Sequence, residues 1–145
     1  MKKENEKGLI YSDIELVSME DVAVFDRGYI EKDKIRSCKV RALVDSGAYT
    51  LCINQSIKDQ LGLRKQESMD AELANGQIEK VDMVGPVKIK IFNRISVCNA
   101  AVLPGDSEVL LGCIPLEDMD LILDPKEETL RLPEDRKYLA RKKIK

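Results

Sequence analysis

The stretch Ala42-Leu43-Val44-Asp45-Ser46-Gly47-Ala48 places one carboxylate directly after a short apolar run. Such a run, bounded by turn formers, is typical of a buried strand. Asp, Ser and Gly are also ordinary turn residues, and a turn has to follow any strand. The interpretation of Asp45 therefore depends on what else the chain supplies.

The composition predicts one globular domain without a membrane span. The chain has 145 residues, of which 43% are hydrophobic and 34% charged, and no apolar run approaches the roughly 20 residues that cross a bilayer. The charged N-terminus precedes no apolar signal core, so we expect a cytoplasmic location. We expect a flexible N-terminus over residues 1–9, a domain over residues 10–132, and a basic C-terminal tail over residues 133–145 whose order the sequence leaves open.

The cysteines and the absence of histidine limit the metal sites and catalytic groups that the chain can form. Cys38, Cys52, Cys98 and Cys113 are scattered without a C-x-x-C pair, and the chain has no histidine. We therefore expect no zinc, and we interpret the cysteines as small buried side chains in a reducing compartment. We also expect no other metal and no cofactor. The lack of histidine excludes Ser-His and Cys-His nucleophile pairs. Acid–base chemistry would have to use carboxylates, Lys, Tyr or Cys.

The first half of the chain predicts strands and one helix. Alternation around Ile10, Ile14 and Leu16 predicts a strand, the run Val22-Ala23-Val24-Phe25 a second, and residues 35–44 a third that ends at Asp45. Asn54 is a good N-cap for a short helix that ends at Gly62. Asn75-Gly76 predicts a β-hairpin with a type I′ turn, which needs positive φ at both residues.

The second half is also mainly β. Residues 87–91 and 95–103 predict two strands, and Val109-Leu110-Leu111-Gly112 predicts a short strand buried on both sides, whose glycine allows another backbone to approach closely. Pro115 can open a brief helix through Met119. A closing hairpin is expected on either side of Asp124-Pro125. The predicted class is all-β with one or two short helices.

Three elements in this order resemble the retropepsin-like aspartic peptidases, over roughly residues 10–132. They are Asp45-Ser46-Gly47-Ala48 after its strand, the hairpin with Ala74-Asn75-Gly76-Gln77, and Leu110-Leu111-Gly112. With Leu61-Gly62-Leu63, the pattern is most similar to the small stand-alone bacterial and archaeal members. The resemblance implies a closed β-barrel-type acid protease fold with one lobe per chain.

The resemblance also implies a homodimer, because the family's reaction needs two carboxylates facing one water and this chain has one Asp-Ser-Gly motif. Charges about 3 Å apart at an effective dielectric near 20 repel by roughly 5 kcal/mol, so two Asp45 carboxylates would share one proton; aspartic-protease dyads are an established case of this effect. One Asp45 would take a proton from water while the other protonates the carbonyl oxygen of a peptide or protein substrate.

The resemblance assigns the remaining roles. Ser46 would brace the two active-site loops across the dimer axis, and Gly47 would bring its N–H to the carboxylate. Ala48 has no hydroxyl to stabilise ionised Asp45, so we expect a less acidic working range than that of lysosomal-type relatives. Residues 74–77 would form the tip of a flap that pairs with substrate.

Several alternatives remain. Asp124 is a possible second acid but is better interpreted as a turn residue, and Asp106, Asp118 and Asp120 as exposed residues. The domain could instead be a non-catalytic dimer that binds peptides or proteins. The basic tail could bind nucleic acid or anionic lipid, although it lacks interleaved aromatics, so nucleic acid is not the expected partner.

Overall fold

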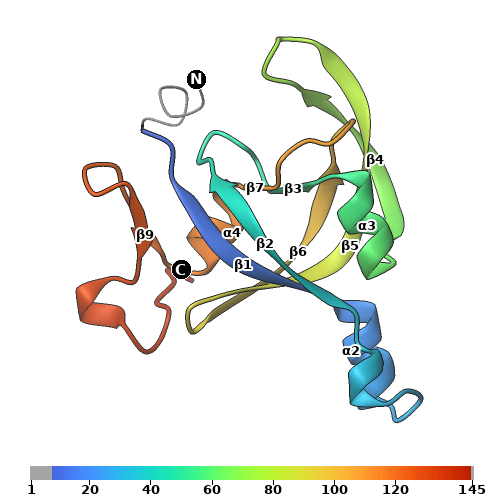
Figure 1. Cartoon of the computed structure of the whole chain (residues 1–145). Helices are drawn as coiled ribbons and strands as arrows, with labels where there is room; N and C mark the ends of the chain where they lie inside the picture. The colour runs from blue at the N-terminus through green and yellow to red at the C-terminus, as the bar shows by residue number, and fades with distance from the viewer. Residues whose placement is uncertain (1–7, 145) are drawn as a thin grey trace.

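A closed β-barrel forms the body of the protein (Figure 1). The computed structural model describes residues 8–144, so the expected flexible N-terminus, residues 1–9, lies almost entirely outside the described residues. The predicted mainly β class with short helices is confirmed. The barrel strands pair in the order β1 (Tyr11–Ser18), β2 (Ser37–Val44), β7 (Leu110–Leu111), β3 (Leu51–Ile53), β6 (Arg94–Val102) and β5 (Ile78–Ile91), and β5 pairs back to β1.

The position of β7 determines how the chain crosses itself. β7 lies between β2 and β3, parallel to β2 and antiparallel to β3, although β2 and β3 are consecutive in the sequence. The loop from Asp45 to Thr50 therefore has to pass the end of β7. That crossing brings the loop against Gly112, the residue that follows β7.

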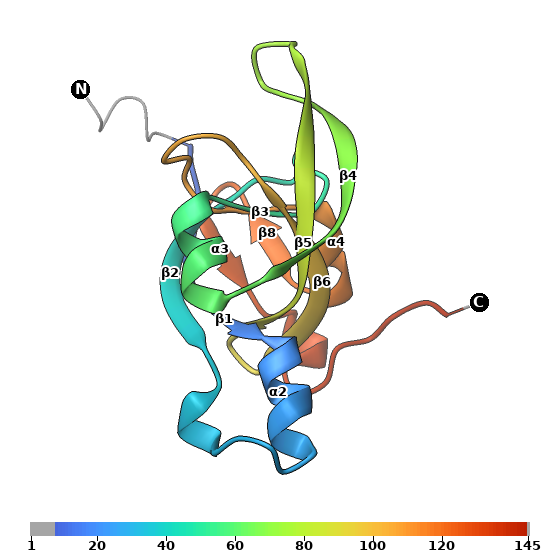
Figure 2. The same cartoon turned by 90° about the vertical axis from the view of Figure 1, so that its right-hand side faces the viewer.

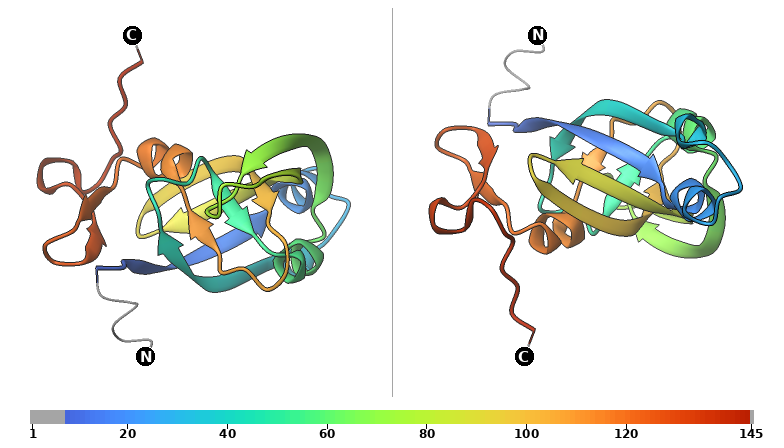
Figure 3. Two further views of the ribbon diagram at one scale, coloured as in Figure 1. Left: turned by 90° about the horizontal axis from the view of Figure 1, so that it is seen from above. Right: turned by 90° about the horizontal axis from the view of Figure 1, so that it is seen from below.

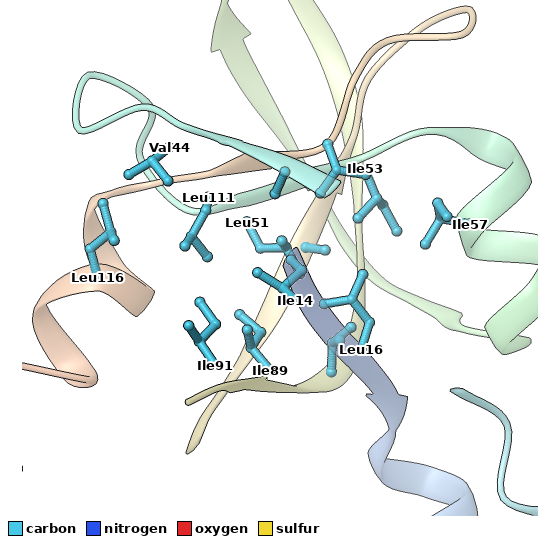
Figure 4. Close-up of a cluster of buried hydrophobic side chains, with 14 of the residues drawn as sticks. Ile14, Leu16, Val44, Leu51, Ile53, Ile57, Ile89, Ile91, Leu111 and Leu116 are labelled. Atoms are coloured by element: carbon cyan, nitrogen blue, oxygen red, sulfur yellow. The ribbon is translucent and has the colours of Figure 1, made fainter. Parts of the chain in front are cut away.

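Aliphatic side chains fill the barrel (Figure 4). They come from alternate positions of the strands, because successive strand residues point to opposite faces. Helices α3 (Gln55–Leu61) and α4 (Cys113–Asp118) close the core with one or two side chains each. The labelled members of this cluster are Ile14, Leu16, Val44, Leu51, Ile53, Ile57, Ile89, Ile91, Leu111 and Leu116.

The strand predicted over Val22–Phe25 is wrong, because these residues belong to helix α2 (Met19–Asp26). The Ser18 hydroxyl caps this helix by accepting from the Asp21 N–H, and Glu20 and Asp21 lie in its first turn. The buried Asp21 also accepts a two-pronged contact from Arg36, at 2.8 and 2.9 Å. Capping and this ion pair outweigh the β propensity of the valines. A short 3₁₀ turn, η1 (Lys32–Lys34), then leads to β2.

Helix α3 (Gln55–Leu61) is confirmed in its caps and its buried face. The Asn54 side chain accepts from the Ile57 N–H at 3.0 Å, and Gly62 adopts the left-handed conformation with φ of 60°. Ile57 and Leu61 are buried. Local cap chemistry alone predicted these features, since both ends are marked in the sequence.

A long hairpin of β4 (Arg64–Glu72) and β5 projects from the barrel (Figure 2). The predicted type I′ turn is wrong, because Gly76 has a φ of 84° whereas Asn75 is not among the residues of positive φ. The Gly76 N–H donates to the Leu73 carbonyl, and the Asn75 side chain accepts from the Gln77 N–H. A turn closed by the glycine and an Asn side chain therefore replaces the tighter two-residue loop.

The C-terminal part comprises α4 (Cys113–Asp118), the hairpin of β8 (Ile122–Asp124) and β9 (Thr129–Arg131), and the 3₁₀ turn η2 (Glu134–Arg136). Helix α4 begins two residues before the expected Pro115. We call residues 133–144 the C-terminal segment; it contacts the domain through the fully buried Pro133 and several ion pairs. Among residues 8–144, no helix has both the length and the apolar character needed to cross a membrane.

Candidate active site

Asp45 begins the loop that joins β2 to β3. Its N–H donates to the Leu111 carbonyl at 3.0 Å, and its own carbonyl accepts from the Ala48 N–H at 3.0 Å. One bond continues the pairing of β2 with β7, and the other closes a tight turn. The backbone under the carboxylate is therefore held from both sides.

The Asp45 carboxylate keeps one oxygen available. Oδ1 accepts the Gly47 N–H at 2.9 Å, whereas Oδ2 has no hydrogen-bond partner among residues 8–144 of one chain. A Cβ on Gly47 would lie 3.2 Å from Oδ1, closer than most such contacts. The close approach that the sequence predicts for Gly47 is thus present, and the half-buried carboxylate is oriented without an ion pair.

The neighbouring loop residues differ in exposure. Ser46 and Gly47 are exposed and Ala48 is half-buried. Ser46 also borders a pocket of about 170 Å³ whose other walls come from α4, from β8 and from the residue just before β8. These wall residues are Cys113, Leu116, Glu117, Leu121 and Leu123.

Gly112 lies at the crossing of the loop and β7. A Cβ at this position would overlap the Thr50 carbonyl oxygen and lie 2.7 Å from that of Ala48. The next two N–H groups, of Cys113 and Ile114, donate to the carbonyls of Ala48 and Tyr49 at 2.8 and 3.1 Å. The Leu110-Leu111-Gly112 motif therefore supports the Asp45 loop directly.

Thr50 is a supporting residue that the sequence reasoning missed. It is buried, and its hydroxyl donates to the Asn99 carbonyl on β6 at 3.2 Å. This bond anchors the far end of the loop, as the pairing with Leu111 anchors its start. The signal was weak, since Thr is also a common strand residue.

The β4–β5 hairpin lies on the same side of the barrel as the Asp45 loop (Figures 1 and 3). Val81 and Met83 of the hairpin pack against Cys52 and Ala101, with Leu110 at the edge of this cluster. The tip residues Ala74, Asn75, Gly76 and Gln77 are exposed. No hydrogen bond in the described part of the chain joins them to the Asp45 loop. The base of the hairpin therefore packs near this loop, whereas its tip makes no hydrogen bond to it.

Three of the cysteines are packing residues. Cys52 is buried, and the half-buried Cys38 and Cys98 pack against the core. The half-buried Cys113 instead borders the pocket beside Ser46. All four are free thiols, and burial, with a smaller contribution from the Asp45 charge, raises the pKa of Cys52 to about 11. The buried Cys52 is therefore neutral at ordinary pH. Nor do residues 8–144 contain a group of three His, Cys, Asp or Glu side chains that could hold a metal ion.

The other acidic candidates lie in structural contacts. Asp124 accepts the Glu127 N–H at 3.1 Å and pairs with Arg131, which is the expected turn role. Asp118 and Asp120 are half-buried rather than exposed, because they bind the C-terminal segment. The structure thus gathers Asp45, Ser46, Gly47, Ala48 and the Leu-Leu-Gly motif in one place, and leaves Asp124 outside it.

A single β-barrel whose Asp-Ser-Gly loop rests on a hydrophobic-hydrophobic-Gly segment beneath a long hairpin defines an aspartic-protease type of fold. A family model described as "gag-polyprotein putative aspartyl protease" matches residues 33–118, more than half of the chain, and the protein belongs to this family. The finer likeness to stand-alone bacterial and archaeal members stays a prediction.

Among solved structures, the solution structure of the simian foamy virus (mac) protease is similar to the chain. The two share 22% identity with a TM-score of 0.41, over 54% of this chain and 80% of the viral one. No curated protein matches the chain.

Proposed function

We propose that the protein is an aspartic endopeptidase that works as a homodimer. The observation that carries this proposal is the Asp45 carboxylate, held by the Gly47 N–H through one oxygen while the other remains available. A side chain placed in this way can accept a proton from water. The family membership supports the same reaction class.

The second carboxylate would come from a second copy. Asp124, the alternative within one chain, uses both oxygens in its own turn and ion pair. Two Asp45 carboxylates across a two-fold axis would share one proton, since two charges about 3 Å apart repel by roughly 5 kcal/mol at an effective dielectric near 20. Dimerisation is then a condition of activity.

In the proposed reaction, ionised Asp45 of one subunit takes a proton from the attacking water. Protonated Asp45 of the other subunit donates its proton to the carbonyl oxygen of the peptide bond, and the resulting diol collapses with proton transfer to the leaving amine. No metal, cofactor or covalent intermediate takes part. Because Ala48 offers no hydroxyl to the carboxylate, we expect an activity optimum above about pH 3.

The hairpin would close over the bound peptide. Within its exposed tip, residues 74–77, the backbone groups of Ala74 and Asn75 make no hydrogen bond in the described part of the chain and can pair with an extended substrate. Closure would exclude water and align the bond to be cut. An extended peptide or unfolded protein segment is therefore the proposed substrate class, and we keep the cytoplasm as the proposed location.

The surface next to Ser46 is the proposed meeting face of the two copies. Tyr49 and Ile114, which are joined by a backbone hydrogen bond, are large apolar residues with 66% and 42% of their surface exposed. The pocket beside Ser46 adds Leu121 and Leu123 to this face. We define the meeting face as these five residues. It is contiguous with the loop that has to meet its copy if two Asp45 carboxylates are to share one water.

The test is incubation of the purified protein with a peptide library, for the unchanged chain and for Asp45→Asn. We expect the variant to lose at least a thousandfold in kcat, because an amide can still accept the Gly47 N–H but cannot take up the water proton. A pepstatin-like mimic of the diol should inhibit the unchanged protein. Cleavage retained by the variant would reject the mechanism.

Dilution provides an independent check. Activity should fall faster than linearly near the dimer dissociation constant, and a fully active monomer would contradict the shared site. If the library is bound in register but never cut by the unchanged protein, the alternative of a non-catalytic peptide-binding dimer is favoured instead.

A further inference from the structure

The C-terminal segment holds the carboxylate that follows α4. Arg136 donates to Asp120 through Nε and Nη2 at 2.8 and 3.1 Å, and the Arg141 N–H donates to the same carboxylate at 3.0 Å. Hydrogen bonds from Arg136, and then from Arg141, lower the pKa of Asp120 to about 2. Basic residues that the sequence left without a role are thus engaged within the chain.

The same end of α4 carries a second contact of this kind. Lys142 pairs with Asp118, the last residue of the helix, at 3.0 Å. Acidic side chains at the carbonyl end of a helix are unfavourable, because that end is already partly negative. The cations of the C-terminal segment offset this charge, so the segment and the end of α4 stabilise each other.

The opposite end of α4 binds the Asp45 loop. Its first two N–H groups donate to the carbonyls of Ala48 and Tyr49, and Gly112 lies against Thr50. One short helix therefore connects the C-terminal segment, at its end, to the candidate active site, at its start. A displacement of α4 would therefore also displace the Asp45 loop.

The C-terminal segment is also fixed to the barrel beneath it. Pro133 is fully buried, the Lys137 carbonyl accepts from the Asn93 side chain at 2.7 Å, and the Arg136 carbonyl accepts from Arg94. Arg94 is only 3% exposed and donates to this carbonyl through Nη2, whereas its Nε and Nη1 have no hydrogen-bond partner in the described part of the chain. Release of the segment would strip this buried cation of the one carbonyl that it binds.

We propose that the C-terminal segment acts as a clasp that positions the active-site loop through α4, with Asp120 and Arg136 as positioning residues. The inference rests on the proposed function for its effect on catalysis, but not for its structural part. Release of the clasp loosens the Ala48 and Tyr49 carbonyls from α4, and Asp45 then loses the fixed geometry that proton transfer requires.

Amide hydrogen exchange of the full chain tests the structural part without reference to activity. In Asp120→Asn and in Arg136→Ala, exchange in residues 45–50 and 112–118 should rise at least tenfold more than in β4 and β5. Arg136 lies in the C-terminal segment itself and not beside α4 in the sequence, so its variant tests the clasp even if Asp120→Asn folds poorly. Asp124→Asn is the matched control, because it removes the same charge from an ion pair that does not touch α4.

Equal exchange changes across the whole chain, or changes as large in Asp124→Asn, would overturn the clasp. If the exchange result is obtained but the unchanged protein cuts no peptide, the proposed function fails and the clasp stands. The two ideas are therefore separable.

Kinetics test the catalytic part. The clasp variants should lose about five- to twentyfold in kcat with KM within twofold, since the substrate-covering hairpin is not part of the clasp. Arg136→Lys should recover part of the loss, because it keeps the charge but not the two-pronged geometry. Unchanged kcat in Arg136→Ala, with loosened loop exchange, would reject the positioning role.

Discussion

Gly112 lies against Thr50 so closely that no side chain fits between them: a Cβ on Gly112 would overlap the Thr50 carbonyl oxygen and lie 2.8 Å from the Thr50 nitrogen. Both obstacles are backbone atoms, and the Thr50 hydroxyl fixes that stretch to β6. The contact arises because β7 separates β2 from β3.

Gly112→Ala should therefore lower the free energy of unfolding by more than about 3 kcal/mol, since backbone and not a flexible side chain has to move. Chemical denaturation measures this loss. Gly47→Ala is the comparison: its Cβ meets only Asp45 Oδ1, at 3.2 Å, so we expect less than about 1 kcal/mol of destabilisation together with a loss of activity. Equal stability losses would contradict the assigned crossing.

Gly76→Ala should lower kcat/KM about tenfold, because its φ of 84° at the hairpin tip is strained for alanine and the tip has to close over substrate. Gly28→Ala is a matched control, with a φ of 83°, nothing within 4 Å of its Cβ, and a position in the turn after α2. Both variants should lose about 1 kcal/mol of stability. An equal loss of activity in the Gly28 variant would argue against a role of the tip.

The lowered pKa of Asp120 predicts that the folded protein loses stability as the pH falls. Its pKa in the folded protein, about 2, lies below that of an unfolded aspartate, about 3.9. Its stabilising contribution is therefore complete above about pH 4 and is lost as the pH falls toward 2. Asp120→Asn should be less stable than the unchanged chain by about 1–2 kcal/mol at pH 7, and this gap should close by pH 2. Denaturation curves at both pH values measure it, and a gap independent of pH would exclude the carboxylate as its source.

Ile114→Glu should separate the two copies, because it places a charge on the meeting face at a residue that is 42% exposed. We expect the dimer dissociation constant to rise at least a hundredfold in sedimentation velocity, with the far-ultraviolet circular dichroism unchanged. Val97→Glu is the control: Val97 is an exposed apolar residue on β6, 48% accessible and outside the meeting face. If Val97→Glu dissociates the dimer and Ile114→Glu does not, the interface lies at β6 and not at the meeting face.

The sequence predicted features that depend on one residue and its local conformation. Asn54 and Gly62 marked the ends of α3, Gly112 marked a close backbone approach, and Asp124 marked a turn. Asn54 and Gly62 act as helix caps, Gly112 acts through its missing Cβ, and Asp124 accepts a hydrogen bond within its turn. Each effect involves only a few neighbouring residues or a single contact, so one residue type is enough to predict it. The Asp45 loop was recognised in this way, although its catalytic role stays a prediction.

Features that depend on distant partners were missed. Helix α2 is stabilised by the pair of Asp21 with Arg36, 15 positions apart, and its valines on their own predicted a strand. The order of the C-terminal segment depends on Asp120, Asn93 and Arg94, which no local pattern connects to residues 133–144. The hairpin at Asn75 is present as predicted, but its turn is of another type. The Asn75 side chain accepts a hydrogen bond from the Gln77 N–H and stabilises that other turn.

The arrangement of β2, β7 and β3 also determines at what point during synthesis the Asp45 loop can fold. The Asp45 N–H binds Leu111, and the carbonyls of the loop bind residues that follow Gly112, so no N-terminal fragment that stops before this point can assemble the loop. A chain emerging from the ribosome must therefore extend past Ile114 before its carboxylate is oriented. Pairing between segments this distant in sequence is a slow step of folding. In the proposed peptidase, a chain that is still being synthesised would therefore have no oriented carboxylate of its own.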